Sequence, residues 1–159
     1  MSDETEGRAQ AALVHLGVPF TVTRHGPVKS LAEAAAARGI APTDLIKTLV
    51  VRRAADEYLF VLLPGDREIS WPKLRAQQQV NRLSLPDAAT ALAVTGYERG
   101  TITPFGATHP WPVIVDASVP GRTISIGGGA HGVGITLASD DLIRVLDAAV
   151  ADISDPPSA

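Results

Sequence analysis

The middle of the sequence contains two apolar segments separated by only three residues, and this feature limits the possible folds most strongly. The segments are residues 45–53 and 57–63, and Ala54-Ala55-Asp56 joins them. Both are rich in the aliphatic and β-branched residues typical of strands, and the short connection predicts a hairpin. Two adjacent apolar strands are expected at the centre of a β-sheet, and the 159 residues suffice for one domain with a sizeable core around it.

The remaining segments alternate between helical and strand-like patterns. Apolar spacing and capping residues predict helices over about 5–16, 30–38, 70–78, 86–95 and 139–150, with a helical turn at 42–44. Strands are predicted at 18–24, 80–83, 113–115, 122–126 and 133–137. This interspersed order favours an α+β domain with a mixed, curled and partly barrel-like sheet flanked by helices. We expect the domain to cover residues 1–153, followed by a flexible tail at 154–159.

Composition and charge exclude several classes of function. The chain has no cysteine, which excludes disulfides, thiolate metal sites and a cysteine nucleophile. Its formal net charge of -3 argues against broad, non-specific nucleic-acid binding and against a DNA-binding role, although a small contact with the end of an RNA stays compatible with it. The acidic N-terminus lacks an apolar segment and no apolar run approaches a membrane span, so we expect a cytoplasmic protein without membrane contact.

Lys47 is the most anomalous residue, because it lies within an apolar predicted strand. A lysine is almost never fully buried unless it is paired. Two explanations fit. In the structural one, the side chain extends to the end of the strand and keeps its ammonium group in water. In the functional one, the ammonium group lies at the mouth of a pocket and meets an anion or a polarised carbonyl.

Two glycine-rich loops are the other candidate features. Residues 96–106 hold three glycines, Pro104 and two aromatic residues, which indicates a loop of defined shape that either contacts a ligand through its backbone or simply turns the chain. Residues 127–132 precede a predicted strand rather than a helix, so a dinucleotide site is not expected, although the backbone N–H groups of this loop stay compatible with a small anion-binding nest. His131 in this loop is either an acid, base or ligand contact, or an exposed histidine without a role.

Other kinds of chemistry find little support. The four histidines, at positions 15, 25, 109 and 131, show no paired ligand spacing, so no metal and no cofactor are expected. The chain contains neither a G-x-S-x-G elbow nor a lysine at the end of a phosphate-binding glycine loop. A lysine, two glycine-rich backbone surfaces and a few polar side chains suit catalysis by positioning and oxyanion stabilisation.

Four motifs in order resemble the YbaK/EbsC family, the free-standing relatives of the editing insertion domain of bacterial prolyl-tRNA synthetase. The resemblance covers about residues 13–153. The motifs are Lys47-Thr48-Leu49, Thr95-Gly96-Tyr97 continuing through Gly100-x-x-x-Pro104, Val113-Ile114-Val115-Asp116, and Gly128-Gly129-x-x-Gly132 before a closing helix.

The resemblance implies a YbaK-like fold and an aminoacyl-tRNA deacylase, which hydrolyses the ester joining a wrong amino acid to the 3′-terminal adenosine, typically of tRNA(Pro). The implied partners are the acceptor end of a tRNA and, in addition, prolyl-tRNA synthetase. Lys47 corresponds to the family's key lysine, and Gly100 to Pro104 correspond to its pocket loop. With His131, Lys47 and Gly100 form the predicted catalytic set. The predicted substrate-binding residues are Thr48, Tyr97, Thr101, Ile102, Thr103, Pro104, Gly128, Gly129, Gly132 and His25.

The sequence departs from the branch of the family that acts on Cys-tRNA(Pro). That branch usually has Ser-Gly-Gly-Lys-Arg-Gly-Leu-Asp where residues 127–134 read Gly-Gly-Gly-Ala-His-Gly-Val-Gly, and it often has a tyrosine where His25 stands. Specificity for cysteine therefore does not follow, and His131 becomes the candidate for the substitute polar group. Two other functions stay open: a non-catalytic module that binds tRNA ends or a synthetase, and a small-molecule hydrolase.

Overall fold

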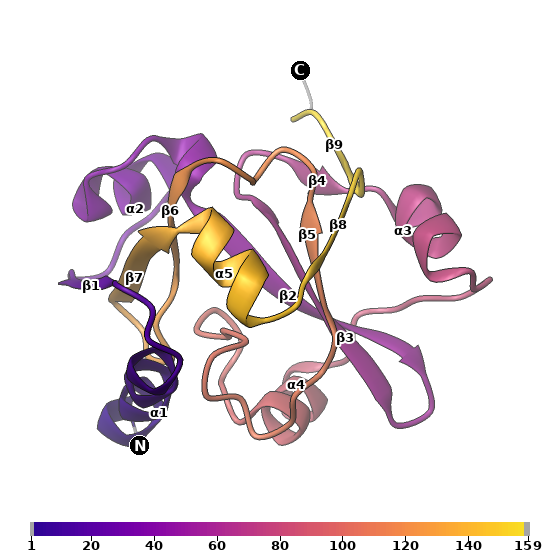
Figure 1. The fold of residues 1–159 in the computed structure, drawn as a ribbon, viewed down its shortest axis with the longest axis horizontal. Coiled ribbons are helices and arrows are strands. Elements are labelled where there is room, and N and C mark those ends of the chain that lie inside the picture. The colour runs from indigo at the N-terminus through magenta and orange to yellow at the C-terminus, as the bar shows by residue number, and fades with distance from the viewer. Residues whose placement is uncertain (1, 158–159) are drawn as a thin grey trace.

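The computed structural model describes residues 2–157, with side chains from Glu4 onward. The chain forms an α+β domain in which helices surround strands of mixed direction (Figure 1). The helices are α1 (Ser2–His15), α2 (Leu31–Arg38), the 3-10 turn η1 (Pro42–Asp44), α3 (Trp71–Gln78), α4 (Ala88–Thr95) and α5 (Ser139–Val145). The strands are β1 (Thr21–Arg24), β2 (Ile46–Ala54), β3 (Glu57–Pro64), β4 (Glu68–Ile69), β5 (Val113–Asp116), β6 (Thr123–Gly127), β7 (Val133–Ala138), β8 (Ala149–Ala151) and β9 (Ser154–Asp155).

The predicted hairpin is confirmed as β2 and β3, and β3 lies inside the largest sheet. That sheet has the strand order β2-β3-β5-β8, with β2 antiparallel to β3 and with β5 parallel to both β3 and β8. Alternate residues of β3 enter two separate cores: Phe60 packs on one face, and Leu59 and Val61 pack on the other. Burial on both faces explains the continuous apolar run, because a half-exposed strand would alternate with polar residues.

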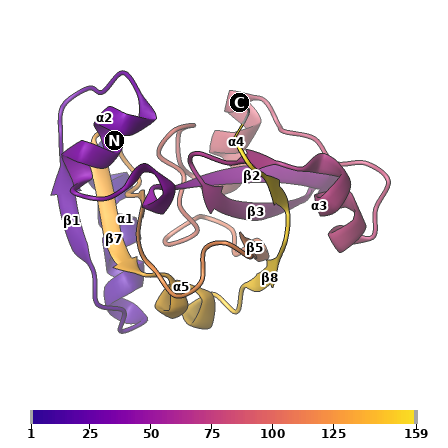
Figure 2. The same cartoon turned by 90° about the horizontal axis from the view of Figure 1, so that it is seen from above.

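A second sheet has the order β1-β7-β6, and the two sheets meet at one point. An isolated parallel bridge joins Leu45, just before β2, to Ser125 in β6. Beyond that bridge the sheets separate, and the loop between α4 and β5 lies between them (Figures 1 and 2). The result is a mixed, curled arrangement of strands without closure into a barrel among the described residues.

Local capping signals placed several helices correctly. Ser70 and Asp87 accept hydrogen bonds from Lys73 N and Thr90 N at the starts of α3 and α4. At α2, Glu33 N donates to Ser30 Oγ (3.1 Å) as a capping box requires. The carboxylate of Glu33, however, accepts from the backbone N of Lys29 (3.0 Å) rather than from that of Ser30.

Two predicted elements in the second half of the chain are wrong. No strand forms at 80–83, because only a bridge between Arg52 and Ser84 ties this largely exposed segment to β2. The last helix ends at Val145 instead of continuing to 150, and β8 follows it beside β5. The backbone hydrogen bonds available beside β5 outweigh the helical apolar spacing there. β5 and β6, although separated by the expected turn, lie in different sheets.

The predicted tail begins with ordered structure. Ser154–Asp155 form β9 and pair with Glu68–Ile69 in β4, and Ser154 is buried. The prediction of flexibility from residue 154 is therefore corrected for these two residues, and residues 158–159 lie outside the described part of the chain.

Candidate active site

One pocket opens along β2 where the two sheets separate, and we call it the strand-edge pocket. Its volume is about 810 Å³. It is lined by residues 45–50, residues 85–87, Leu31, Arg38, Gly65, Ala91, Arg99, Gly100, Ile102 and Gly127. Segments far apart in the sequence thus meet around one cavity, and they include the predicted site residues Lys47, Thr48, Gly100 and Ile102.

The exposed backbone edge of β2 forms one wall of this pocket. Arg52 exchanges two backbone hydrogen bonds with Ser84, from Arg52 N to Ser84 O (2.7 Å) and from Ser84 N to Arg52 O (3.2 Å). This pairing lies on the side of β2 away from β3. Because backbone groups alternate along a strand, those of Thr48 and Val50 point to the same side as those of Arg52, toward the pocket.

Lys47 borders the pocket, but its ammonium group is directed to the turn after β3. Nζ donates to the backbone O of Arg67 (2.6 Å). Alternation along β2 places Lys47 on the face of Leu49 and Val51, which belong to the core that contains α3. Burial lowers the pKa of Lys47, and the charges of Glu68 and Asp66 oppose that change. The ammonium group thus has a backbone partner instead of extending into water, and the residue borders a pocket; its predicted contact with substrate stays a prediction.

Thr48 lies on the opposite face of β2, with Ile46 and Val50 of the other core. Its Oγ1 is buried and has no hydrogen-bond partner within residues 2–157. Buried hydroxyls are normally paired, so an unpaired one in a pocket wall marks a position where a ligand can bond. The structure therefore singles out Thr48 more clearly than the sequence did.

The loop at 96–106 presents its backbone to the pocket, and hydrogen bonds from Tyr97 and Arg8 hold its backbone in place. Gly100, with a φ of 92°, lines the pocket together with Ile102. Tyr97 is fully buried, donates from its hydroxyl to Phe105 O (2.6 Å), and has its pKa raised to about 12 by that burial. Arg8 of α1 donates to Gly96 O (2.8 Å) and Gly106 O (3.2 Å) at the two ends of the loop.

The other predicted residues of this loop do not line the pocket. Thr101 and Thr103 are buried and bond within the loop, from Thr101 Oγ1 to Glu98 O (2.8 Å) and from Phe105 N to Thr103 Oγ1 (3.3 Å). Tyr97 and Pro104 are likewise absent from the pocket wall. Their geometry supports the shape of the loop.

The second glycine loop packs against the first. Gly129 N donates to Thr101 O (3.1 Å), and Gly127 borders the pocket. Gly128, Gly129 and Gly132 lie outside the pocket wall, where they allow close approach of backbone. A Cβ on Gly132, for example, would lie 2.4 Å from His25 O. Close packing therefore explains why these three positions are glycine, and their predicted contact with substrate stays a prediction.

The two predicted histidines lie beside the pocket rather than in its wall. His131 is 70% exposed, and its Nε2 lies 3.3 Å from Oε2 of Glu98. Its Cε1 would lie 3.7 Å from a Cβ built on Gly100, so the ring lies on the side of that glycine to which a side chain would point. His25 accepts a hydrogen bond at Nε2 from Arg38 Nε (3.4 Å), and Arg38 does line the pocket.

Sequence reasoning missed the arginines of the pocket. Arg38 lies in the last turn of α2, where a basic residue is already explained by the helix dipole. In the structure Arg38 donates from Nη1 to Ser125 Oγ (3.2 Å) and Ile126 O (3.3 Å), and burial lowers its pKa. Arg99 donates to Pro86 O (2.7 Å). Together with Lys47 they set three cations against one carboxylate, Asp87, in the pocket wall.

Comparison with known proteins identifies the group to which this arrangement belongs. A family model described as the aminoacyl-tRNA editing domain matches residues 25–145. The chain belongs to this family. The match covers β2, both glycine loops and all of α5, and therefore includes every segment that lines the pocket.

The curated relatives of this editing domain include proline–tRNA ligases. The sequence is 28% identical over 125 residues to the enzyme of Bacillus licheniformis and 32% identical over 126 residues to that of Desulfovibrio desulfuricans. In both cases the match covers 79% of this chain and 21% of the ligase. The chain thus spans about a fifth of the length of these relatives.

Solved structures confirm the expected YbaK-like fold. One, described as a candidate trans-editing enzyme for prolyl-tRNA synthetase, superposes with a TM-score of 0.86 at 21% identity and covers 95% of this chain and 97% of that one. Another, the hypothetical protein APE2540, has a TM-score of 0.85 at 24% identity and covers 93% of this chain and 99% of that one.

The chemistry available to this editing domain follows from the pocket wall. Thr48 is the one hydroxyl side chain among the described residues that line it, and Lys47, Arg38 and Arg99 supply positive charge. No cluster of three metal-binding side chains occurs in the part of the chain that the structure describes, nor does any helix there have the length and apolarity to cross a membrane. The wall therefore offers charge, hydrogen bonds and a shaped backbone.

Proposed function

We propose that the protein is a trans-acting aminoacyl-tRNA deacylase that clears mischarged tRNA, most often tRNA(Pro). The observation that carries the proposal is the strand-edge pocket of an editing-family chain, in which Lys47, Thr48 and Gly100 meet at one cavity. Its volume, about 810 Å³, falls in the usual range for small-molecule sites and suits an aminoacyl-adenosine.

Each residue has a role that its position supports. Arg38 and Arg99 attract the phosphates next to the terminal adenosine. The unpaired hydroxyl of Thr48 and the backbone edge of β2 hydrogen-bond the ribose or the ester. An ammonium group has three donors, so Lys47 can keep its bond to Arg67 O and still donate to the substrate. Gly100 brings backbone close to the ester because it has no side chain.

The reaction is hydrolysis of one ester bond. The oxygen of a water molecule adds to the ester carbonyl carbon, and the bond from that carbon to the ribose oxygen breaks. The proton that the water loses ends on the ribose oxygen. Positioning of water and ester, together with donors aimed at the oxyanion, lowers the barrier, and no protein nucleophile takes part.

The decisive test is deacylation of a panel of tRNA(Pro) charged with alanine, cysteine, serine or threonine. The purified protein is expected to clear at least one ester faster than buffer, and Lys47→Ala is expected to lose that activity. An equally active Lys47→Ala protein would contradict the proposed site. Binding of tRNA or of prolyl-tRNA synthetase without any turnover would instead indicate a non-catalytic module.

This function also defines partners and location. The acceptor end of tRNA is the substrate, and prolyl-tRNA synthetase, the source of the mischarged tRNA, is the second partner. Both work where translation takes place, so the proposal places the protein in the cytoplasm. His131 enters it as the group whose ring lies beside Gly100, and a His131→Ala variant in the same panel measures its contribution.

A further inference from the structure

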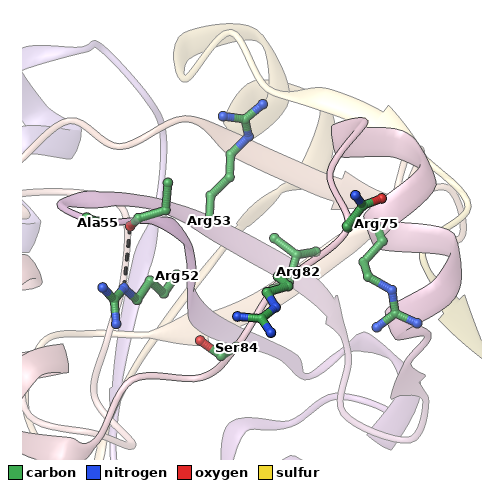
Figure 3. A pocket seen from close by; sticks show the side chains of 9 residues that line it. Arg52, Arg53, Ala55, Arg75, Arg82 and Ser84 are labelled. Carbon is green, nitrogen blue, oxygen red and sulfur yellow. Dashed lines mark hydrogen bonds between the residues drawn. The ribbon is translucent and has the colours of Figure 1, made fainter.

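A second pocket lies farther along the same strand and has a different character. This arginine pocket has a volume of about 610 Å³ and is lined by Arg52, Arg53, Ala54, Ala55, Arg75, Asn81, Arg82, Leu83 and Ser84 (Figure 3). It gathers four of the 14 Lys and Arg residues of a chain whose net charge is -3. The described residues of its wall include no carboxylate.

Most of these guanidinium groups have unused donors. Arg53 has the most partners, since it bonds Glu57 (3.5 Å) and Gln78 O (3.3 Å), and it points away from the other three in Figure 3. Arg52 uses only Nε, which donates to Ala54 O (3.4 Å). Arg75 and Arg82 make no side-chain hydrogen bond or ion pair within residues 2–157. Three cations that line one pocket and have no carboxylate partner among the described residues repel each other, and an anion between them reduces that repulsion.

The two pockets are built on the same two chain segments. β2 lines the strand-edge pocket with residues 46–50 and the arginine pocket with residues 52–54. The segment before α4 runs beside β2 in the opposite direction and lines the first pocket with residues 85–87 and the second with residues 81–84. The bridge between Arg52 and Ser84 fixes this arrangement. One extended ligand can therefore follow both segments from one pocket to the other.

The separation of the pockets limits what such a ligand can be. Lys47 and Arg52 are five residues apart on one strand, which corresponds to about 17 Å. A single aminoacyl-nucleoside is too short to fill both pockets, whereas a polynucleotide carries a negative charge at every residue. Guanidinium groups also match the bidentate geometry of phosphate oxygens.

We propose that Arg52, Arg75 and Arg82 form a phosphate-binding site for the backbone of the tRNA, several nucleotides from the ester held in the strand-edge pocket. The proposal rests on the proposed function for the identity of the ligand. It assigns affinity for the tRNA body to the arginine pocket, because a local cluster of arginines binds phosphates even in a chain whose net charge is -3.

The first experiment measures binding alone and does not depend on catalysis. Uncharged tRNA(Pro) is titrated with wild type, Arg75→Gln and Arg82→Gln between 50 and 200 mM NaCl, with Arg144→Gln as the matched control. Arg144 is also an exposed arginine, on α5, and pairs with Asp141. Each pocket variant is expected to reduce the slope of log K against log salt by about one, and the control to leave it unchanged. Unchanged slopes in the pocket variants would overturn the proposal.

The second experiment separates the two pockets during turnover. Hydrolysis is compared on charged tRNA(Pro) and on the 3′-ester of adenosine with the same amino acid. The pocket variants are expected to raise KM for the tRNA about 3- to 10-fold without changing hydrolysis of the adenosine ester. An equal loss of hydrolysis on both substrates would refute a role of the arginine pocket in holding the tRNA body. Variants that bind tRNA normally but lose binding to prolyl-tRNA synthetase would refute it too. If wild type hydrolyses neither ester, the proposed function fails. The binding experiment still tests whether the arginine pocket binds tRNA phosphates.

Discussion

The strand-edge pocket and the arginine pocket share β2 and the segment before α4, yet they are built in opposite ways. The first is enclosed largely by backbone and aliphatic side chains, with an unpaired hydroxyl and a partly buried lysine in its wall. The second has arginine as four of its nine lining residues, and most of these arginines are exposed. Under the proposed function, this difference corresponds to a division of work: shape and buried donors act on the reacting ester, and charge retains the polymer to which the ester is attached.

Replacing Lys47 is expected to have the largest effect and to affect both substrates. Loss of one donor aimed at a developing oxyanion typically costs about 10²–10³ in rate. Lys47→Ala should therefore lower kcat/KM by about that factor on charged tRNA and on the adenosine ester alike, as measured by release of the labelled amino acid. A loss confined to charged tRNA would mean that Lys47 helps to bind the tRNA body and does not act on the ester.

Salt should separate the pockets without any substitution. The three phosphate contacts of the arginine pocket alone are expected to weaken tRNA binding about 40-fold when the salt concentration rises from 50 to 200 mM, because log K falls by roughly 0.9 per contact for each unit of log salt. Hydrolysis of the adenosine ester, followed in the same buffers, should change far less. A similar salt dependence for both substrates would contradict the separate roles of the two pockets.

A side chain at Gly100 tests the backbone wall of the strand-edge pocket. Gly100→Ala places a Cβ in a left-handed conformation, at a φ of 92°, and is expected to lower kcat about tenfold on both substrates. Gly121→Ala is the matched control, since Gly121 has a φ of 79° and no atom within 4 Å of its Cβ position. Both variants carry similar backbone strain, so thermal unfolding of the two should agree while their activities differ.

The orphan hydroxyl of Thr48 should matter less. Thr48→Val removes one hydrogen bond to substrate, worth about 1 kcal/mol, and should lower kcat/KM about fivefold. The free energy of unfolding should stay unchanged or rise, because the lost hydroxyl has no partner among the described residues. A clear loss of stability would mean that the hydroxyl serves the fold rather than the ligand.

The smallest effect concerns pH. Burial lowers the pKa of Lys47, so its ammonium group loses the proton below the ordinary lysine value of 10.5. Binding of a non-hydrolysable amide analogue of the adenosine ester should weaken by a few-fold as pH rises through that lowered pKa, and Lys47→Ala should show no such loss. Stability changes in the opposite sense, because the folded state disfavours the charged lysine and gains stability as the pH rises. Analogue affinity that stays constant up to pH 10.5 would exclude a contact with the ammonium group.

The sequence was sufficient where local rules determine the outcome. Capping at Ser70 and the β2–β3 hairpin follow from neighbouring residues, and Lys47 stood out because a charge interrupts an apolar strand. The arginine pocket could not be predicted in this way, because Arg52 and Arg82 line one pocket only after residues 81–84 fold back along β2. β8 was missed for the same reason, since its pairing with β5 depends on contacts across the whole chain.

The clamp that Arg8 forms on the pocket loop has a consequence for the limits of the functional unit. The family match begins at residue 25, but the ends of the loop at 96–106 are fastened by a side chain at position 8. A chain trimmed to the matched residues would retain every motif and lose the clamp, together with the α1 residues Ala9 and Leu13 that are buried in the core. The folded unit therefore includes its first helix, and the boundary of the family match is a poor guide to where this protein can be cut.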